Sequence, residues 1–362
     1  MTATLCLCMI VKNEAAIIER CLRSVRPLVS TWVIVDTGST DGTQDIVRRF
    51  FAGMPGELHE RPWKSFGENR SEAMQLARGK ADYTLVMDAD DELSIPPGWQ
   101  LPPLDRDAYH LLLTRGAHSM YRAQLFRSAL PWRYEGVLHE YPTCDQEVRQ
   151  ARMPGLRILM HPDSARSSDP DKYQKDARVL EEALAREPDN ARYAFYLAQS
   201  YRDAGLHEQA IAAYRKRAAM GGFAEEVWYS LFQVGQIGEK AGRPADEVIA
   251  AYLTAFDNRP SRAEAPCALA RYCRRQGRHA SAYVFARAAA EIPRPKDRLF
   301  LDEVVYAARA LDELTMAAHH TGRHAEAARI ARELLAGGKL PPGERGRIER
   351  GLTLSEQAAG GG

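Results

Sequence analysis

The sequence predicts an α/β domain built on a doubly wound parallel sheet, followed by an all-α array of helical hairpins. Its 362 residues are too many for one ordinary hydrophobic core. Up to about residue 165, apolar strand-like runs alternate with segments of helical periodicity. From Pro170 onward the strand-like runs end, and the chain becomes rich in alanine, arginine and glutamate. These observations predict two domains of different class.

The alternation in the first part can be followed element by element. We expect strands at 5–11, 32–35, 58–60 and 83–87, and helices at 14–25, 44–51 and 66–77. Thr43 is the expected N-cap of the second helix, with Asp45 in its first turn. Strands that alternate with helices pair in parallel, and the helices then cover both faces of the sheet.

Polar residues follow three of the expected strands. They form the clusters Lys12-Asn13-Glu14, Asp36-Thr37-Gly38-Ser39 and Asp88-Ala89-Asp90. Ligands of doubly wound sheets bind at the carboxyl ends of the strands, so all three clusters are candidates for a site. A carboxylate at the end of a strand, such as Asp36, can accept hydrogen bonds from a base or a ribose. The alternative interpretation is a set of turns and helix caps.

Asp88 and Asp90 bring two carboxylates together directly after a buried strand. Like charges at this spacing repel and raise a pKa unless a cation lies between them. Mg²⁺ or Mn²⁺ binds one or two protein carboxylates and completes its coordination with substrate phosphates. The pair therefore indicates a divalent cation site, although an acidic turn in solvent has the same sequence.

An internal repeat appears in the second part. Gly205, Gly277 and Gly322 each begin a Gly-x-His-x-x-Ala motif, and Gly242 marks a degenerate copy. The four glycines are 37, 35 and 45 residues apart. We interpret the glycine as the end of one helix and the alanine as a small residue where paired helices approach. The histidine is then a repeat position and not a metal ligand.

Composition and charge exclude several classes of function. Lys plus Arg number 49 and Asp plus Glu number 48, so the net charge of +1 gives no basic excess for nucleic acid. No apolar run reaches the ~18–20 residues of a membrane span, and the N-terminus lacks the pattern of a signal peptide. We therefore expect a cytoplasmic protein whose six cysteines are reduced and mostly buried.

Four stretches in the first 92 residues together resemble family 2 glycosyltransferases of the GT-A fold. They are Met9-Ile10-Val11-Lys12-Asn13-Glu14, Ile34–Thr43, Asn69-Arg70-Ser71-Glu72-Ala73 and Met87-Asp88-Ala89-Asp90-Asp91-Glu92. The second part resembles tetratricopeptide repeats, and the combination is similar to bacterial glycosyltransferases that modify glycocin peptides. The resemblance implies a UDP-sugar donor, Mn²⁺ or Mg²⁺, inversion at the anomeric carbon, and a peptide or protein acceptor.

The resemblance also implies roles for individual residues. Asp36 would contact the nucleobase, and Arg70 would face the base or the diphosphate. Asp88 would approach the ribose and the metal, while Asp90 would bind the metal as the second catalytic residue. His139 would complete the metal site. The residues expected to contact the nucleotide sugar are Val11, Asn13, Glu14, Asp36, Arg70, Asp88 and Ala89.

Glu140 is the candidate general base. An inverting transfer needs a carboxylate within hydrogen-bond reach of the acceptor group, and Glu135 and Asp107 are its rivals. Two other functions stay open, namely transfer to a saccharide or lipid-linked acceptor, and a non-catalytic scaffold that binds a nucleotide.

The expected domains are a catalytic domain over 1–168, a repeat domain over 169–357 and a disordered tail over 358–362. Helical arrays of this kind offer a concave face for an extended peptide. The repeats could also join two copies of the chain in a homodimer.

Overall fold

The computed structural model describes residues 2–115, 118–161, 163, 169–297, 299–337, 340 and 343–360. The chain forms two compact units, Met1–Ala185 and Arg186–Gly362. The expected domain boundary after residue 168 falls at the end of the segment 164–168, which lies outside the described residues. The helix that follows this segment belongs mostly to the first compact unit.

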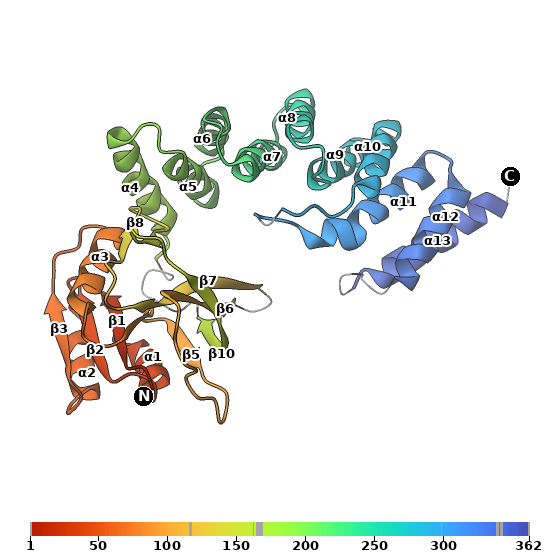
Figure 1. The fold of residues 1–362 in the computed structure, drawn as a ribbon. Helices are drawn as coiled ribbons and strands as arrows, with labels where there is room; N and C mark the ends of the chain where they lie inside the picture. The colour runs from red at the N-terminus through yellow and green to blue at the C-terminus, as the bar shows by residue number, and fades with distance from the viewer. Residues whose placement is uncertain are drawn as a thin grey trace. The chain divides into compact units, whose positions relative to one another are not determined.

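The first unit is built on an eight-stranded sheet with the order β3-β2-β1-β4-β7-β6-β10-β5 (Figure 1). Its strands in chain order are β1 (Leu5–Val11), β2 (Thr31–Asp36), β3 (Gly56–Glu60), β4 (Tyr83–Val86), β5 (Asp91–Ser94), β6 (Ala108–Arg115), β7 (His118–Arg127) and β10 (Gln150–Met160). A separate antiparallel pair consists of β8 (Arg133–Glu135) and β9 (Tyr141–Thr143).

The sheet is mixed, which corrects the expectation of a wholly parallel sheet. Strands β1 to β4 pair in parallel, as the strand–helix alternation predicts. Strand β7 then pairs antiparallel with both β4 and β6. The register pairs Arg115 with His118, so β6 and β7 form a hairpin with a short connection, and such a connection permits only antiparallel pairing.

Helices cover both faces of the parallel half. Helices α1 (Ile18–Val25) and α2 (Thr43–Phe50) pack on the face that carries alternate β1 residues such as Leu7. Helix α3 (Phe66–Ala77) packs on the opposite face against Cys6 and Cys8. The described cysteines are all free, and burial raises the pKa of Cys6 to about 12, as expected of an unreactive buried thiol.

The caps of two helices position the loops of the site. Gly42, with φ +90°, is the N-cap of α2, so the expectation that Thr43 caps this helix was wrong. Thr43 is instead the first helical residue, and its hydroxyl donates to Asp41 at 2.6 Å. Ser65 caps α3 by accepting a hydrogen bond from the Glu68 amide at 3.1 Å.

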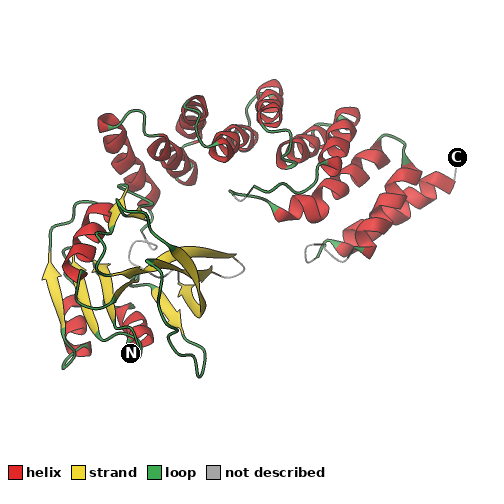
Figure 2. Ribbon diagram, in the orientation of Figure 1, coloured by secondary structure: helices red, strands yellow, loops and turns green. Residues whose placement is uncertain are grey.

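The second unit is all helical, and Figure 2 shows no strand in it among the residues that are drawn by structure type. The helices after the sheet are α4 (Lys172–Arg186), α5 (Ala191–Asp203), α6 (His207–Ala219), α7 (Ala224–Lys240), α8 (Ala245–Asn258), α9 (Glu264–Arg275), α10 (His279–Glu291), the π-helix η1 (Val305–Arg309), α11 (Ala310–His320), α12 (His324–Ala336) and α13 (Arg345–Gly360).

The repeat motif forms the predicted helical hairpins. Gly205, Gly242, Gly277 and Gly322 follow α5, α7, α9 and α11, and each has a φ between +68° and +77°. The motif alanines lie buried in the next helix at 210, 282 and 327. The degenerate copy at Gly242 is thus a real hairpin. The longest spacing, 45 residues, contains an extra segment between α10 and α11.

The end of the chain differs from the expected tail. Residues 358–360 belong to α13, and residues 361–362 lie outside the described part. None of the described helices is long and apolar enough to cross a membrane.

Candidate active site

The loops that follow β1 and β2 are tied to each other at the carboxyl edge of the sheet. The Asn13 amide donates to Ser39 Oγ at 2.8 Å, and Asn13 Oδ1 accepts from the Thr40 amide at 2.9 Å. The Glu14 amide donates to Thr43 Oγ1 at 2.9 Å. Asn13 has a φ of +56°, a left-handed conformation that asparagine tolerates better than most residues. Two of the predicted polar clusters therefore form one structure.

Asp36 lies at the end of β2 and is 1% exposed. Its Oδ1 accepts hydrogen bonds from the amides of Gly38 and Ser39 at 2.9 and 2.8 Å, and from Gln44 Nε2 at 3.1 Å. Within the described part of the chain, its buried Oδ2 has no hydrogen-bond partner. A buried acceptor without a partner costs about 1–3 kcal/mol, which a ligand with an N–H group would recover.

A cavity of about 340 Å³ borders Asp36. Its lining comes from β2, the loop after it, α2 and the end of β3, and consists of Asp36, Gly38, Ser39, Gln44, Glu60, Arg61 and Pro62. The lining is polar and lies at the edge where the parallel strands end. This is where a doubly wound sheet binds nucleotides.

Arg70 on α3 is the centre of a second cluster. Its Nη2 is paired with Asp88 Oδ1, and its Nε lies 2.6 Å from Glu140 Oε1. The guanidinium also lies over the Tyr134 ring, 5.8 Å from the centroid. Burial alone would lower the pKa of Arg70, but the carboxylates of Asp88 and Glu140 outweigh it and raise the pKa. The arginine therefore stays charged.

The Glu140 loop reaches α3 because a glycine leaves room for it. A Cβ added at Gly67 would lie 2.3 Å from the carbonyl oxygen of Gly136. Ser71 Oγ, one turn further along α3, accepts from the Tyr134 amide at 2.8 Å. These two contacts hold β8 and its following loop on α3, and they bring Glu140 to Arg70.

Asp88 is neutralised by two arginines. Besides Arg70, Arg122 Nη2 on β7 lies 3.3 Å from Asp88 Oδ2. Burial would raise the pKa of Asp88, but the two guanidiniums lower it to about 2. The next buried carboxyl, Asp91, is 2% exposed, and burial together with the Asp88 charge raises its pKa to about 8. One carboxylate is thus charged and the other protonated near neutral pH.

The three residues expected to bind a metal do not converge. Among the described residues, no group of three His, Cys, Asp or Glu side chains could hold a metal ion. Asp88 is paired with Arg70 and Arg122, and His139 is an exposed residue with φ +52°. The Asp90 carbonyl accepts from Arg20 Nη2 at 3.1 Å. The set Asp88, Asp90 and His139 therefore does not fit a three-ligand site in this arrangement.

The candidates for the general base lie in different places. Glu140 is half-buried and paired with Arg70. Glu135 accepts from Arg133 at 2.9 Å and from the Tyr141 hydroxyl at 2.9 Å. Asp107 is paired with Arg127 at 3.0 Å, and Arg127 is in register with the first residue of β4. Asp107 therefore lies at the opposite edge of the sheet from Asp88, which argues against it as a base.

The remaining predicted contact residues have structural partners. The Val11 carbonyl accepts from the Thr37 amide at 2.9 Å and from its hydroxyl at 3.1 Å. Ala89 is 5% exposed and packs in the core that includes α1. Both residues shape the edge of the sheet, and any contact with a donor would go through their backbone.

Comparison with known proteins agrees with this geometry. Residues 6–104 match the model of the glycosyl transferase family 2, and residues 173–223 match a tetratricopeptide repeat model. The first unit thus contains a segment that matches family 2 glycosyltransferases, and a segment that matches tetratricopeptide repeats follows it. The predicted resemblance and fold class are confirmed in both parts. The family match covers Asn13, Asp36 and Asp88 at the ends of the strands and Arg70 on α3.

Individual relatives match parts of this chain. A TPR repeat-containing protein of Synechococcus elongatus is 33% identical over 169 residues, which are 44% of this chain and 40% of the relative. The lipopolysaccharide core biosynthesis glycosyltransferase LpsC of Rhizobium meliloti is 32% identical over 82 residues, 22% of this chain and 29% of the relative. The chain thus spans less than half the length of these relatives. The MamA crystal structure is 19% identical over 46% of this chain and 82% of its own, with a TM-score of 0.37.

Several residues of this candidate site were missed by sequence reasoning. Gln44, Glu60, Arg61 and Pro62 line the cavity, and Arg122 is paired with Asp88. Gln44 lies in the first turn of α2 and could have been found from the helix that follows Asp36. Arg122 carries no local signal, because its pairing depends on the register of β7 against the rest of the sheet.

Proposed function

We propose that this chain transfers a sugar from a UDP-sugar to a peptide or protein side chain. The observation that carries the proposal is Asp36, whose buried Oδ2 borders a 340 Å³ cavity and has no hydrogen-bond partner in the described part of the chain. A uracil base offers the N–H donor that this oxygen lacks. Binding the base would recover the cost of an unpaired buried acceptor.

The diphosphate would be bound by the arginines around Asp88. Strand β1 lies between β2 and β4, so the Asp36 cavity and the Asp88 cluster occupy the same edge of the sheet. Cleavage of the sugar–phosphate bond leaves negative charge on the departing diphosphate. Arg70 and Arg122 provide guanidinium groups there, and charge stabilisation of this kind speeds a reaction when it strengthens in the transition state.

The acceptor would lose its proton to Glu140. In the arrangement described, Arg70 Nε lies 2.6 Å from Glu140 Oε1, so this carboxylate oxygen faces the guanidinium and not an acceptor. If Arg70 turns toward the diphosphate when the donor binds, Glu140 is released from the pair and becomes available as a base. Donor binding and activation of the acceptor would then be linked through a single arginine. A thiol acceptor, with its lower pKa, needs this help less than a hydroxyl.

Mn²⁺ or Mg²⁺, which the family resemblance implies, has no step in this mechanism. The three expected ligands do not converge, and Arg70 and Arg122 already supply positive charge beside Asp88. The need for a metal is measured by adding EDTA in the turnover assay described below. Asp90→Ala, compared with the wild type in that assay, tests the metal-binding role that the family resemblance implies for Asp90.

The acceptor class follows from the second unit. Helical-hairpin arrays bind extended segments along one face, which favours a peptide or a protein. The match to LpsC, named for lipopolysaccharide core biosynthesis, supports a saccharide acceptor as the second candidate. A scaffold without turnover is a further hypothesis, which the turnover assay described next separates from the enzyme. A homodimer through the repeats is a separate hypothesis, tested by the molar mass of the full chain in light scattering.

The test is release of UDP from UDP-glucose, UDP-N-acetylglucosamine and UDP-galactose, with and without acceptor. We expect slow release from one donor, accelerated by peptide acceptors more than by oligosaccharides. Acceleration by oligosaccharides alone would support the second candidate. Absence of any release, with UDP still bound, would contradict catalysis and leave a scaffold.

A further inference from the structure

The segment between α10 and α11 folds back over the repeat array. It spans residues 292–304 and accounts for the 45-residue spacing between Gly277 and Gly322. Its residues contact Phe195 on α5, Tyr229 on α7 and Arg262 just before α9. These are the first helices of three successive hairpins. First helices of such an array together line one face, and that face is where arrays of this kind bind extended chains.

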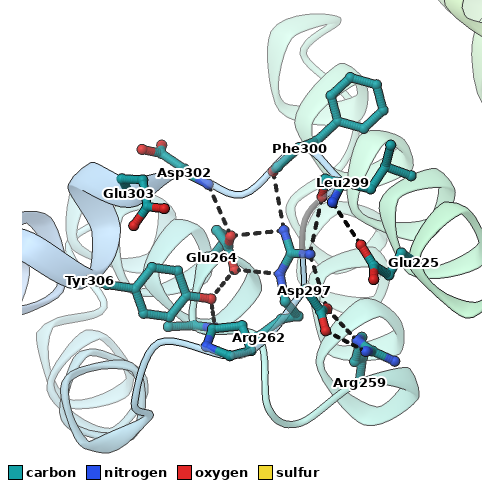
Figure 3. Close-up of polar contacts among 12 residues, drawn as sticks. Glu225, Arg259, Arg262, Glu264, Asp297, Leu299, Phe300, Asp302, Glu303 and Tyr306 are labelled. Atoms are coloured by element: carbon teal, nitrogen blue, oxygen red, sulfur yellow. Dashed lines mark hydrogen bonds and ion pairs between the residues drawn. The ribbon is translucent and has the colours of Figure 1, made fainter. Parts of the chain in front are cut away.

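Arg262 binds the backbone of this segment (Figure 3). The side chain is fully buried, and its guanidinium lies 3.8 Å from the centroid of the Trp228 ring. Its Nη1 donates to the Leu299 carbonyl at 3.3 Å, and its Nη2 donates to the Phe300 carbonyl at 3.1 Å. Two carbonyls of consecutive residues are therefore held by one arginine of the array.

Two glutamates of the array bind the backbone amides of the same segment. Glu225 Oε2 on α7 accepts from the Leu299 amide at 2.7 Å, and Glu264 Oε1 on α9 accepts from the Asp302 amide at 3.2 Å. Glu264 is itself fixed by Arg262 at 2.9 Å and by the Tyr306 hydroxyl at 2.6 Å. The array thus recognises both donors and acceptors of a main chain.

Side chains of the segment add an aromatic contact and charges. Phe300 stacks on Tyr229 with ring centroids 4.1 Å apart, and Arg202 of α5 donates to the Tyr229 hydroxyl at 2.9 Å. Asp297 accepts two hydrogen bonds of 2.6 Å from Arg259. Asp302 is paired with Arg309 at 2.5 Å. The face is therefore complementary to an aromatic residue between two acidic residues.

We propose that this face is a recognition site for an extended peptide with an aromatic residue between two acidic ones. We also propose that Asp297 and residues 299–302 occupy it as a built-in substitute ligand. A partner peptide would have to displace the segment. When the segment leaves, Arg262 and Glu225 lose backbone partners inside the array, and only another main chain restores them at the same positions. The face therefore selects an extended peptide over a helix.

The segment itself is suited to displacement. Phe300 has a φ of +48°, a left-handed conformation that is unfavourable for a bulky residue, and its side chain is 45% exposed. The residues that bind the segment lie on helices of the array or directly beside them. Their backbone positions are therefore set by the helices and not by the segment. A segment in a strained conformation on a preformed surface is displaced more readily than an element packed in a hydrophobic core.

The test is binding of a fluorescent peptide with the chain's own sequence from 295 to 304, measured by anisotropy on the full chain. In the wild type the segment competes with the peptide, which weakens the apparent affinity. Phe300→Ala weakens the segment's own contact, so we expect this variant to bind the peptide at least tenfold more tightly. Phe300→Tyr keeps the aromatic stack and should bind like the wild type. Adding Tyr229→Ala to Phe300→Ala should abolish this gain in peptide affinity, because the peptide's aromatic residue loses its stacking partner.

Two outcomes would overturn the proposal. One is a Phe300→Ala variant that melts cooperatively and binds the peptide no more tightly than the wild type, since the segment would then be a permanent brace. The other uses the wild type and needs no substitution. Saturating peptide should speed hydrogen exchange in fragments that cover 296–303, and unchanged exchange contradicts displacement. No donor sugar takes part, so failure here leaves the proposed transferase function untouched.

Discussion

Arg70 decides the charge state of the site at the scale of single residues. It is paired with Asp88 and with Glu140, and it is only 12% exposed at its side chain. Each carboxylate would be unfavourable at this depth without the guanidinium. The same arginine therefore supports the fold of the site and, in the mechanism proposed, controls when Glu140 can accept a proton.

Arg70→Ala should lower the free energy of unfolding by about 3 kcal/mol, because the half-buried Glu140 loses its guanidinium partner and Asp88 keeps only Arg122. Urea denaturation followed by circular dichroism measures the loss. Arg23→Ala is the control, since Arg23 is 70% exposed and its ion pair with Glu19 should contribute less than about 1 kcal/mol. Equal stability of the two variants would show that Arg70 is not needed to hold Asp88 and Glu140 in place.

Sequence reasoning found the residues of the site better than their partners. Asn13, Asp36, Arg70 and Asp88 were all predicted, because each lies in a motif beside the end of a parallel strand. The pairing of Asp88 with Arg122 could not be predicted, since it depends on an antiparallel strand 34 residues later in the chain. The metal prediction rested on the two nearby carboxylates Asp88 and Asp90 and stays a prediction. The arginines that supply positive charge around Asp88 were not part of it.

Gly67 connects elements, because it allows the loop after β8 to touch α3. In a helix interior, replacing glycine by alanine normally stabilises by up to about 1 kcal/mol. Gly67→Ala should do the opposite, since the new Cβ would lie 2.3 Å from a backbone oxygen. Gly351→Ala in α13 is the matched control, because nothing lies within 4 Å of its Cβ position and stability should rise. We expect the melting temperature to fall in Gly67→Ala and to rise in Gly351→Ala. A stabilised Gly67→Ala variant would contradict the close approach of the loop to α3.

Helices α10, α11 and α12 bring four histidines together, namely His279, His319, His320 and His324. The rings of His279 and His320 are stacked with centroids 4.4 Å apart, and those of His319 and His324 lie 5.0 Å apart. Although His320 is exposed, partial desolvation, then the neighbouring His279 and His319 and finally Arg274, lower its pKa below 6.5. The unfolded chain then takes up this proton at higher pH than the folded chain does. The contribution of neutral His320 to the free energy of unfolding is therefore present above pH 6.5, and it is lost as the pH falls below this value.

His320→Gln should reduce this sensitivity to acid. Melting temperatures of the wild type and the variant, measured from pH 7.5 down to pH 5, should diverge below about pH 6.5, with the wild type losing more. His207→Gln, in the first repeat copy and outside the cluster, should follow the wild-type curve. Parallel curves for His320→Gln and the wild type would exclude a role for this histidine.

At the scale of elements, sequence patterns correctly predicted the strands and helices whose formation depends on residues close together in the chain. Strand β1 and helix α3 have the bounds that apolar periodicity indicates, and the repeat glycines end the helices that they were expected to end. The hairpin of β6 and β7 and the segment 292–304 were not predicted. Both are held by contacts with residues distant in sequence, such as Tyr83 with Arg127 and Leu299 with Glu225.

The whole molecule consists of two compact units, Met1–Ala185 and Arg186–Gly362. A chain truncated after residue 185 keeps the complete sheet together with Asp36, Arg70 and Glu140. We expect it to retain hydrolysis of the UDP-sugar and to lose transfer to a peptide acceptor. Chromatographic assay of free sugar and glycosylated peptide separates the two activities. Transfer by a folded truncation at the full-length rate would mean that the repeats do not select the acceptor.

The central claim is that Asp36 binds the base of a nucleotide sugar, and calorimetric titration of UDP tests it most directly. Asp36→Asn keeps an oxygen for the amides of Gly38 and Ser39, but replaces the unpartnered Oδ2 by an N–H₂ group that cannot accept a hydrogen bond. We predict a loss of about 1–3 kcal/mol in UDP binding, with a melting temperature close to that of the wild type. This loss is about a five- to 150-fold weaker dissociation constant. UDP affinity equal to that of the wild type, in a folded Asp36→Asn variant, would contradict the account.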